Sequence, residues 1–459
     1  MSKWMRTGGG LLFPLLLLCV LLSISPGVSA ADSTSAAPAM TLTLPKAIDL
    51  ALNRNRDVLI AGQDRQKARE QVSEAWSNAL PQITASGDYL RNLQLPVMFM
   101  PANSAFNPTN STESIEIGSN NSYSVGASFV QPLYNRKVGV ALDIAGTYEK
   151  YADQAFQATA EDVTRNTTKA FYRVMLAKEL VEANRQGLDV VKANLDNVRS
   201  LYAHGNAAEF DLLRAEVQFA NTEPLLITAQ NNLELAMNSL KALLAIPLDQ
   251  NLALDGTFQF EEIPTAQIED ARLNAITRNP ELAQIALQES LATQSVAVVK
   301  ADYFPALSLI GSYGWQSQDN TYQWSRYKWA NSFGVGLHLS YTLFDGMATR
   351  SRVAEANSDR TKLHYLRLKA EEGLRIQLRS VESQMDEARK RIEAQQKSVG
   401  QAEKALQISQ TRYKSGIGTQ LELLDTQVAM TRAQTNYSQA IYDYLTAKAD
   451  WQYYASNLR

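Results

Sequence analysis

The chain has 459 residues and a formal net charge of −3, with basic and acidic residues nearly balanced. This balance leaves no basic surplus of the kind that a nucleic-acid partner requires. The only cysteine, Cys19, lies in a segment that we expect to be removed, so the mature chain should have no thiol for a disulfide, a metal or a nucleophile.

Residues 1–30 have the features of a secretory signal peptide. Two basic residues precede an apolar run from Leu11 to Leu22, and Val28-Ser29-Ala30 offers a small-residue cleavage site. Cys19 follows leucines within the apolar run, which does not resemble a lipid-attachment site. We therefore expect the chain to be exported and to begin with a flexible tail over residues 31–44.

Residues 45–248 are expected to form a first unit of two strands and a helical hairpin. A helical pattern from Pro45 to Ala79 ends before Pro81, and the period then changes to two. Two alternating segments, joined by a Pro-, Asn- and Ser-rich loop, predict a strand pair. The alternating residues are Ile83, Ala85, Gly87 and Tyr89 in the first strand and Tyr123, Val125, Ala127 and Phe129 in the second.

Two long helices complete this unit. The first is predicted from Ala141 to Ala203, and at 1.5 Å per residue it would extend roughly 95 Å, about three times the apolar thickness of a bilayer. It should therefore stand in water beside the membrane. The second returns from about Asn206 to Ile246, with a kink or local irregularity at Pro224.

Apolar residues recur every seven positions along the first long helix, which is typical of a coiled-coil seam. The main column is Val174, Val181, Leu188, Leu195 and Tyr202, and the second column is Ala170, Ala177, Val191 and Val198. A second long helix, predicted from about Ala348 to Ser415, repeats the main column 211 residues later as Met385, Ile392, Val399, Leu406 and Tyr413. This agreement indicates a duplicated chain.

A linker over residues 249–267 is expected to join the first unit to a second unit over residues 268–459. The strands of the second unit are predicted from Ala306 to Gln316 and from Ser332 to Phe344, and its last helix from Thr419 to about Tyr454. No segment after the leader approaches the roughly 18 to 20 apolar residues of a membrane-spanning helix. If the mature chain crosses a membrane, we expect strands to do so.

The four predicted strands of one chain cannot close a membrane barrel, because open edges would leave backbone groups unpaired in lipid. Two chains would supply the minimum of eight strands, and three would supply twelve and leave a wider lumen. We expect three, because a barrel on rods of this length serves best as a conduit. Taken alone, the same strands would also suit an ordinary soluble sheet.

Aromatic residues around the second strand pair favour the membrane interpretation. They fit the belt at a bilayer boundary, although aromatic residues also fill soluble cores. These candidate membrane-interface residues are Tyr313, Trp315, Trp324, Tyr327 and Trp329.

With these features in order, the chain resembles the TolC-type family of outer-membrane efflux proteins. The resemblance is clearest at two segments, which are Tyr202-Ala203-His204-Gly205 with Asp211-Leu212-Leu213 and Tyr413-Lys414-Ser415-Gly416 with Glu422-Leu423-Leu424-Asp425. It implies a mainly α-helical protein with a membrane β-barrel. A homotrimer would form a 12-stranded barrel and a periplasmic α-helical tunnel, located in the cell outer membrane and extending into the periplasm.

The resemblance also implies a function. The chain would be the exit duct of a tripartite efflux or type I secretion system, passively conducting substrates from a periplasmic adaptor and an inner-membrane transporter of RND or ABC type. The turns around Tyr202, Gly205, Tyr413 and Gly416 would dock the adaptor. Drugs, metal ions and polypeptides all remain possible cargo.

A periplasmic adaptor and an enzyme are the two alternatives to an exit duct. A periplasmic adaptor also has a long helical hairpin, but it should show one hairpin between compact β-domains rather than a duplicated unit. An enzyme fits least well, because nothing resembles a nucleophile with its base, a phosphate loop or a metal cluster. We expect no cofactor and no metal.

Acidic residues at the start of the last helix are the candidate gate. Glu422 and Asp425 are three residues apart and point the same way, so threefold symmetry would ring the tunnel with up to six carboxylates that favour cations. The family has acidic residues at the matching positions. Alternatively, Thr419 to Glu422 is a capping box, and Asn206 to Glu209 resembles another.

Two further positions bear on closure of the tip. Asp211 belongs to the candidate constriction or else ties its own turn together, and Arg214 stands where Asp425 has its counterpart in the first unit. Arg214 could pair with Asp211 or with Asp425 of a neighbouring copy. Gly418 departs from the longer, often basic residue of some family members, so the contact that closes the tip is expected to differ.

Overall fold

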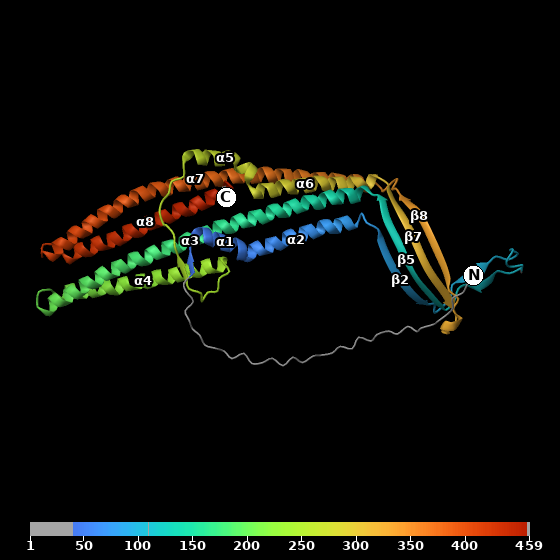
Figure 1. The fold of residues 1–459 in the computed structure, drawn as a ribbon, viewed down its shortest axis with the longest axis horizontal. Coiled ribbons are helices and arrows are strands. Elements are labelled where there is room, and N and C mark those ends of the chain that lie inside the picture. Colours follow the sequence, from blue (N-terminus) through green and yellow to red (C-terminus); the bar gives the residue numbers. More distant parts are fainter. Residues whose placement is uncertain (1–39, 109, 457–459) are drawn as a thin grey trace, which may run out of the picture.

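The computed structural model describes residues 40–108 and 110–456. The predicted signal peptide and residues 31–39 of the predicted tail lie outside the described residues. Long helices occupy most of the length of the molecule, and a sheet lies at one end (Figure 1). The turns of two long helical hairpins lie together at the other end.

A strand over Met40–Leu42 and a helix that begins at Leu44 correct the prediction of a flexible tail up to residue 44. Strand β1 (Met40–Leu42) pairs in parallel with β6 (Leu252–Leu254), and helix α1 (Leu44–Arg54) follows directly. Leu42 is fully buried. A strand of three residues is too short to show an alternating pattern in the sequence.

The helix predicted from Pro45 to Ala79 is in fact two helices, α1 and α2 (Arg56–Ser77). Asn55 separates them, because its side chain accepts a 2.8 Å hydrogen bond from the backbone nitrogen of Asp57 and donates one of 2.9 Å to the carbonyl of Leu243. An asparagine that caps a helix in this way ends the preceding helix locally.

The second unit repeats this break at Asn279. Helix α5 (Thr265–Arg278) ends there and α6 (Pro280–Lys300) begins, capped by a 3.1 Å hydrogen bond from the backbone nitrogen of Leu282 to the Asn279 side chain. The predicted linker over 249–267 therefore contains β6 and the start of α5. A 3-10 turn, η1 (Ala301–Tyr303), leads from α6 toward the sheet.

Four antiparallel strands form one sheet in the order β2-β5-β7-β8. Strands β2 (Gln82–Arg91) and β5 (Asn121–Tyr134) belong to the first unit, and β7 (Ala306–Asp319) and β8 (Ala330–Ser340) belong to the second. Both predicted strand pairs are confirmed, although β8 ends before Phe344. The sheet has two outer strands, β2 and β8, and each is paired on one side only.

The loop between β2 and β5 contains a small hairpin that the sequence did not indicate. Strand β3 (Val97–Met100) pairs with β4 (Glu113–Glu116) in the antiparallel sense. Their four residues each are again too few for a reliable period. A 3-10 turn, η2 (Trp324–Arg326), lies between β7 and β8.

The predicted long helices are confirmed. Helix α3 (Arg136–Ala203) has 68 residues and α7 (Ala348–Lys414) has 67, so each extends about 100 Å. The returning helices α4 (Glu209–Leu243) and α8 (Gln420–Tyr454) have 35 residues each. Helix α4 continues through Pro224 as one element.

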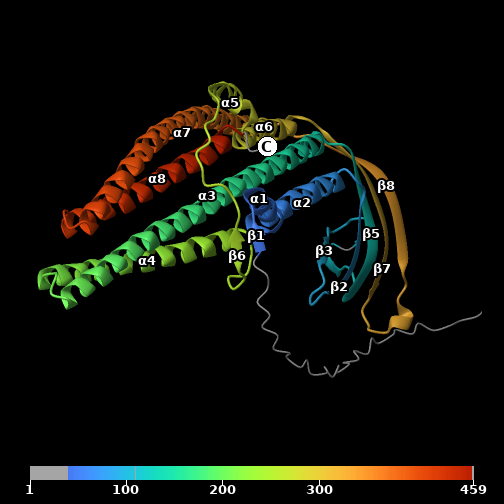
Figure 2. The same ribbon diagram turned by 60° about the vertical axis from the view of Figure 1, so that its left-hand side comes forward.

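Near the sheet, four helices lie side by side in the order α2-α3-α6-α7, which is the order of the strands that adjoin them (Figure 2). Further from the sheet, α4 packs on α3, and α8 packs on both α3 and α7. The chain therefore forms one continuous layer. Its outer helices are α2 and α7, and its outer strands are β2 and β8.

The core lies along the long helices. Val174, Leu195, Met385 and Ile392 of the seven-residue columns are at most 5% exposed, which confirms core packing at these positions, whereas Tyr202 at the end of its column is 43% exposed. Apolar clusters form around Phe171 in the first unit and around Trp451 in the second. Within the described residues, no helix is both long and apolar enough to cross a membrane.

Candidate functional site

The two hairpin turns have the same backbone design. Gly205 (φ 76°) and Gly416 (φ 72°) have left-handed backbones, which confirms the expectation that they end the long helices. The nitrogen of Gly205 donates to the carbonyl of Tyr202 at 2.9 Å, and that of Gly416 donates to the carbonyl of Tyr413 at 3.1 Å. The candidate docking residues therefore lie together at one end of the molecule (Figure 1).

Gly418 has no space for a side chain. A Cβ at this position would lie 3.0 Å from the Cβ of Arg412 and 3.0 Å from the backbone nitrogen of Tyr413. The backbone nitrogen of Gly418 also donates to the Arg412 carbonyl at 3.0 Å. The turn is therefore folded back tightly on the end of α7, so a longer residue at this position would require a different turn.

The start of α8 holds Glu422 in two contacts with its own hairpin. Thr419 is the N-cap residue, and its hydroxyl accepts a hydrogen bond of 3.2 Å from the backbone nitrogen of Glu422, as the capping box predicts. The Glu422 carboxylate lies 3.6 Å from the Nε of Arg412, and both side chains are about half exposed. Such an exposed ion pair contributes little stability, but it partly neutralises Glu422.

Asp425, unlike Glu422, has no arginine beside its carboxylate in the described part of the chain. It lies one turn further along α8, it is exposed, and it makes no ion pair or side-chain hydrogen bond with the described residues. Of the two acidic residues, Asp425 therefore carries the charge that is least compensated within one chain.

The first hairpin departs from the prediction in two ways. Ala208 is the N-cap of α4 and offers no side-chain cap, so Asn206 to Glu209 does not form the expected capping box. Arg214 forms no ion pair with Asp211 in the described part of the chain. Instead, Arg199 and Glu216 are 3.1 Å apart and tie α3 to α4.

Polar contacts join the two hairpins near the tip. The amide of Gln420, at the start of α8, donates a 3.3 Å hydrogen bond to the backbone carbonyl of Asp211. Further along α8, Gln427 donates one of 2.8 Å to the carbonyl of Gly187 in α3. Both glutamines are buried, at 7% and 4% exposure. Neither glutamine could be identified from the sequence, because an isolated glutamine in a helix gives no signal of burial.

Tyr413 also lies between the hairpins. Its partial burial raises the pKa of the phenol, and the nearby Asp211 carboxylate raises it further, while a hydrogen bond with Asn197 acts in the opposite direction. Tyr413 is therefore protonated and able to donate a hydrogen bond at neutral pH. Asp211 thus interacts with the second hairpin in two ways. Its backbone carbonyl accepts a hydrogen bond from Gln420, and its carboxylate acts electrostatically on the phenol of Tyr413.

A groove of about 500 Å³ opens between α3 and α7 beside these contacts, and Leu423 of α8 also lines it. Asn194, Asn197, Gln410, Tyr413, Lys414 and Leu423 are among the residues that line it. Asn194 is buried, and neither polar atom of its amide has a hydrogen-bond partner among residues 40–108 and 110–456. The two hairpins are therefore in incomplete contact here.

The predicted interface aromatics divide into two groups. Tyr313, Trp315 and Trp329 are 39%, 44% and 46% exposed, and the rings of Tyr313 and Trp315 pack edge to face. Tyr327 is only 8% exposed, because its ring packs on Tyr123 and its hydroxyl donates to the carbonyl of Thr321 at 2.8 Å. Tyr327 is thus a packing residue within one chain. Trp324 lies in η2, beside this group in the sequence.

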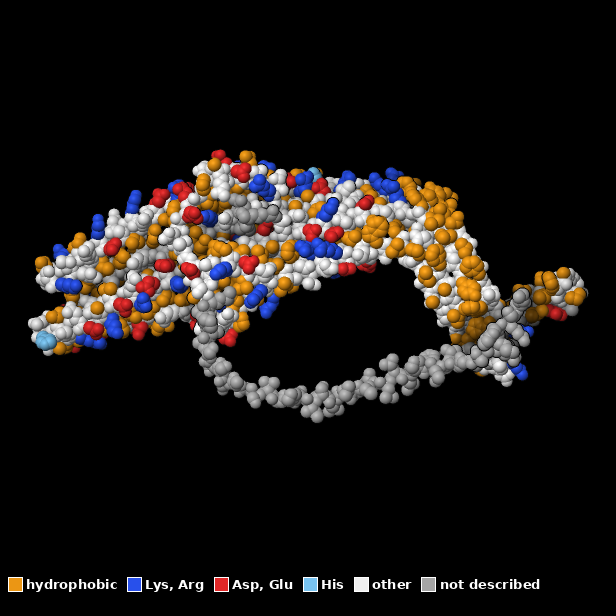
Figure 3. Space-filling view, viewed as in Figure 1, with side chains coloured by type: hydrophobic (Ala, Val, Ile, Leu, Met, Phe, Trp, Pro, Cys, Tyr) orange, Lys and Arg blue, Asp and Glu red, His pale blue; other side chains and the backbone are white. Residues whose placement is uncertain are grey.

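Charge is distributed unevenly over the surface. Apolar side chains gather over the strands, whereas Lys, Arg, Asp and Glu are spread along the helices (Figure 3). Within residues 40–108 and 110–456, no group of three or more His, Cys, Asp or Glu side chains could hold a metal ion.

Comparisons with known proteins agree with this arrangement. The model of the outer membrane efflux protein family matches residues 47–245 and 272–451. The chain is 27% identical over 342 residues to the alkaline protease secretion protein AprF of Pseudomonas aeruginosa, with 73% of this chain and 70% of that protein covered. It is 25% identical over 430 residues to the outer membrane protein TolC of Vibrio cholerae, with 91% of each covered.

Solved structures share the fold. The Campylobacter jejuni CmeC outer membrane channel superposes with a TM-score of 0.73 at 18% identity, with 90% of this chain and 85% of that chain covered. The Vibrio cholerae outer membrane protein VceC gives a TM-score of 0.72 at 15% identity, with 90% and 95% covered. Since the family model covers both units, the chain belongs to the outer membrane efflux protein family and is an outer-membrane exit duct.

Proposed function

We propose that three copies of this chain form one continuous duct, in which a twelve-stranded barrel in the outer membrane continues into a tunnel of twelve helices. The observation that carries this proposal is the shared order of β2-β5-β7-β8 and α2-α3-α6-α7. Both layers have free outer members on the same two sides. Repeating the chain around an axis would close both layers at once.

Closure of the sheet has a physical cause. The outer strands β2 and β8 have unpaired backbone groups along one edge, and each unpaired group in lipid costs several kcal/mol. Pairing β8 of one copy with β2 of the next satisfies them. The exposed apolar residues of β8, among them Phe333, Val335, Leu337 and Leu339, would then face lipid or the next strand. Tyr313, Trp315 and Trp329 would lie near a bilayer boundary.

The hairpin tips would form the inner mouth of the duct. Asp425 and Glu422 of three copies would ring it, with Asp425 dominant because Arg412 partly neutralises Glu422. Asp211 and Arg214 would contribute from the first hairpin, and Arg214 is free to approach a neighbouring copy because it forms no ion pair with Asp211. A ring of carboxylates favours cations over anions.

The proposed partners rest on the family match and on the exposed residues at the hairpin tips. A periplasmic adaptor would dock at the turns that contain Tyr202, Gly205, Tyr413 and Gly416, and an inner-membrane transporter of RND or ABC type would supply the energy. Exposed apolar residues at the tips, including Phe210 at 70% and Ile417 at 73%, provide a surface for such a partner. AprF and PrtF are secretion proteins by name, which supports polypeptide export beside efflux.

The proposal is tested by purifying the protein from outer membranes, measuring its native mass and recording its conductance in a planar bilayer. We expect a trimer that migrates as one species until it is heated and that gives cation-selective channels. A monomer without channel activity in otherwise folded protein would contradict the proposal.

A further inference from the structure

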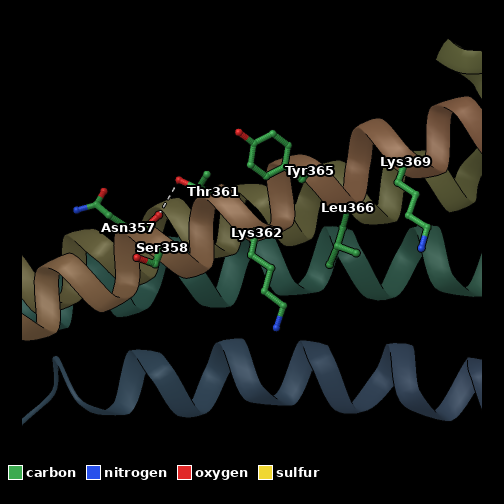
Figure 4. A pocket seen from close by; sticks show the side chains of 7 residues that line it. All are labelled: Asn357, Ser358, Thr361, Lys362, Tyr365, Leu366 and Lys369. Atoms are coloured by element: carbon green, nitrogen blue, oxygen red, sulfur yellow. Dashed lines mark hydrogen bonds between the residues drawn. The ribbon is translucent and has the colours of Figure 1, made fainter.

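Two hollows of the chain differ in one respect, which is the presence of a buried polar group. A hollow of about 640 Å³ in the half of α7 nearer the sheet is lined by α7 residues alone. Lys362, Leu366 and Lys369 point to one side of that helix, and Asn357 and Tyr365 point to the other (Figure 4). None of its lining side chains is a buried polar group that lacks a hydrogen-bond partner within the described residues. This hollow is therefore the open surface of one helix.

The groove of about 500 Å³ near the tip does contain such a group. Asn194 lines this groove and is 7% exposed. Neither the oxygen nor the nitrogen of its amide has a hydrogen-bond partner in residues 40–108 and 110–456. Buried polar groups are almost always paired, because an unpaired one loses its contacts with water and gains none in exchange. Asn194 therefore has both an acceptor and a donor to offer to a ligand.

The two hairpins are joined by polar contacts on either side of Asn194. Farther from the tip, Gln427 of the second hairpin donates to the carbonyl of Gly187, seven residues before Asn194. Nearer the tip, Tyr413 and Asn197 are hydrogen-bonded, and Asn197 is three residues after Asn194. The walls of the groove are thus held at a fixed spacing, so the site is largely formed before a ligand enters it.

The groove extends along one face of α3. Its lining from this helix begins at Asp189 and ends at Asn197, a distance of about 12 Å at 1.5 Å per residue. Helices α3 and α7 both run from the sheet toward the tip (Figure 1). Because Asn197 meets Tyr413, the groove-lining Gln410 lies at the level of Asn194, three residues earlier in each helix. One amide from each hairpin therefore lines the middle of the groove.

The two ends of the groove have opposite charges. Asp189 lies at the end away from the tip, and Lys414 lies at the end near the tip. Both side chains are exposed, and neither makes an ion pair or a side-chain hydrogen bond within the described part of the chain. Val190, Ala193 and Leu423 add apolar surface to the lining. A complementary ligand therefore has a cationic end, an amide in its middle and an anionic end.

We propose that this groove binds a short zwitterionic peptide of about three residues. Its amino group faces Asp189 and its carboxylate faces Lys414. The N–H of its central residue donates to the amide oxygen of Asn194, and the C=O of the same residue accepts from the amide nitrogen. About three extended residues span roughly 10 Å, which matches the length of the groove.

The charges at both ends define the class of ligand. A loop of a folded partner protein offers peptide groups but has neither terminus to place beside Asp189 and Lys414. A free amino acid has both charges but no peptide group for Asn194. The groove lies within one chain, so this inference goes beyond the proposed duct and does not depend on the trimer.

Trialanine is the probe, titrated into the purified mature protein in detergent and followed by calorimetry. We expect saturable binding, with binding of N-acetyl-trialanine amide at least fivefold weaker, because that peptide has no terminal charges. Alanine alone should give no saturable heat. Failure of trialanine to bind, or equal binding of the blocked peptide, would overturn the proposal. A trimeric, conducting protein that does not bind trialanine would overturn this inference alone and leave the duct intact.

Asn194→Leu tests the central contact, because leucine has a similar volume and no amide. Since the amide has no partner in the described chain, we expect this variant to unfold at a higher temperature than the parent protein in the absence of peptide. It should also lose trialanine binding by at least tenfold. Unchanged binding in a folded Asn194→Leu protein would overturn the role of this residue and the site with it.

Lys414→Gln tests one charged end without altering the buried part of the groove. It should weaken trialanine binding severalfold and leave binding of the blocked peptide unchanged. The matched control is Lys404→Gln, since Lys404 is also exposed on α7 but does not line the groove. Equal effects of the two lysine variants would show that the general charge of the protein, and not the position of Lys414, attracts the peptide.

Discussion

Gln427 of α8 donates a 2.8 Å hydrogen bond to the backbone carbonyl of Gly187 in α3, a residue 240 positions earlier in the chain. The helices approach closely at this point, because a Cβ at Gly187 would lie 3.1 Å from the hydroxyl of Thr431. The two hairpins are thus held near the tip by a polar contact at a glycine rather than by a continuous apolar seam.

This contact should fix the spacing between the hairpins. Gly187→Ala is expected to push α8 away and to weaken the contact with Gln427, at a cost of about 1–3 kcal/mol. Thr431→Ala should make room for the added methyl group and restore most of the loss. Thermal unfolding of the two single variants and the double variant measures this coupling, and strictly additive effects would show that the two residues do not meet.

Neutralising Asp425 should reduce cation selectivity. Asp425→Asn removes a charge that has no partner in the described part of its own chain, whereas Glu422→Gln removes one that Arg412 already partly neutralises. We therefore expect the larger shift of reversal potential, measured in a potassium chloride gradient across a planar bilayer, from Asp425→Asn. Unchanged selectivity in both variants would argue against a carboxylate ring at the inner mouth.

Gly418→Ala should destabilise the second turn. The added Cβ would lie 3.0 Å from the backbone nitrogen of Tyr413, where nothing flexible can yield, and such crowding costs about 1–3 kcal/mol. Gly400→Ala is the matched control, since it lies in α7 with no atom within 4 Å of the new Cβ and should be neutral or slightly stabilising. Limited proteolysis at Lys414 compares the two variants, and equal cleavage would contradict this account.

The contact between α6 and α7 should weaken in acid. Partial burial would raise the pKa of Glu289, but hydrogen bonds from His364 and Arg367 outweigh that effect and hold it below the ordinary value of 4.5. The neighbouring Glu371 also pairs with Arg367. Because the folded pKa of Glu289 is depressed, its stabilising contribution is present above pH 4.5 and is lost as the pH falls through the folded value.

Glu289→Gln should therefore be less stable than the parent protein at neutral pH, and the difference should shrink below pH 4.5. The exposed Glu403, which has no side-chain partner within the described residues, provides the control as Glu403→Gln. Melting curves across this pH range make the comparison. A constant difference between parent and Glu289→Gln would show that ionisation of Glu289 does not stabilise the contact.

The repeated, long-range features of the fold could be predicted from the sequence. The seven-residue columns that include Val174 and Met385 extend over many turns, and each copy of the unit supports the other. The strand pairs were found for the same reason. By contrast, β1 and β6 have three residues each, and β3 and β4 have four, so no period could develop.

Local chemistry explains the other differences. The breaks at Asn55 and Asn279 depend on single side chains that cap the following helix, and a helical period alone does not reveal them. The positions of Gln420 and Gln427 depend on how the hairpins pack, which the sequence of either helix does not contain. The left-handed glycines at the tips were predictable, because Gly205 and Gly416 follow uninterrupted helical patterns.

The pairing of β1 with β6 determines where in the fold the described part of the chain begins. Leu42 is fully buried and Leu254 is 8% exposed, so the chain is anchored beside the long helices, away from both the sheet and the tips (Figure 2). A label or affinity tag placed just ahead of Met40 would consequently be attached beside the middle of the long helices, on the periplasmic side. In the proposed assembly, such a tag would obstruct neither the barrel opening nor the hairpin tips proposed to bind a partner.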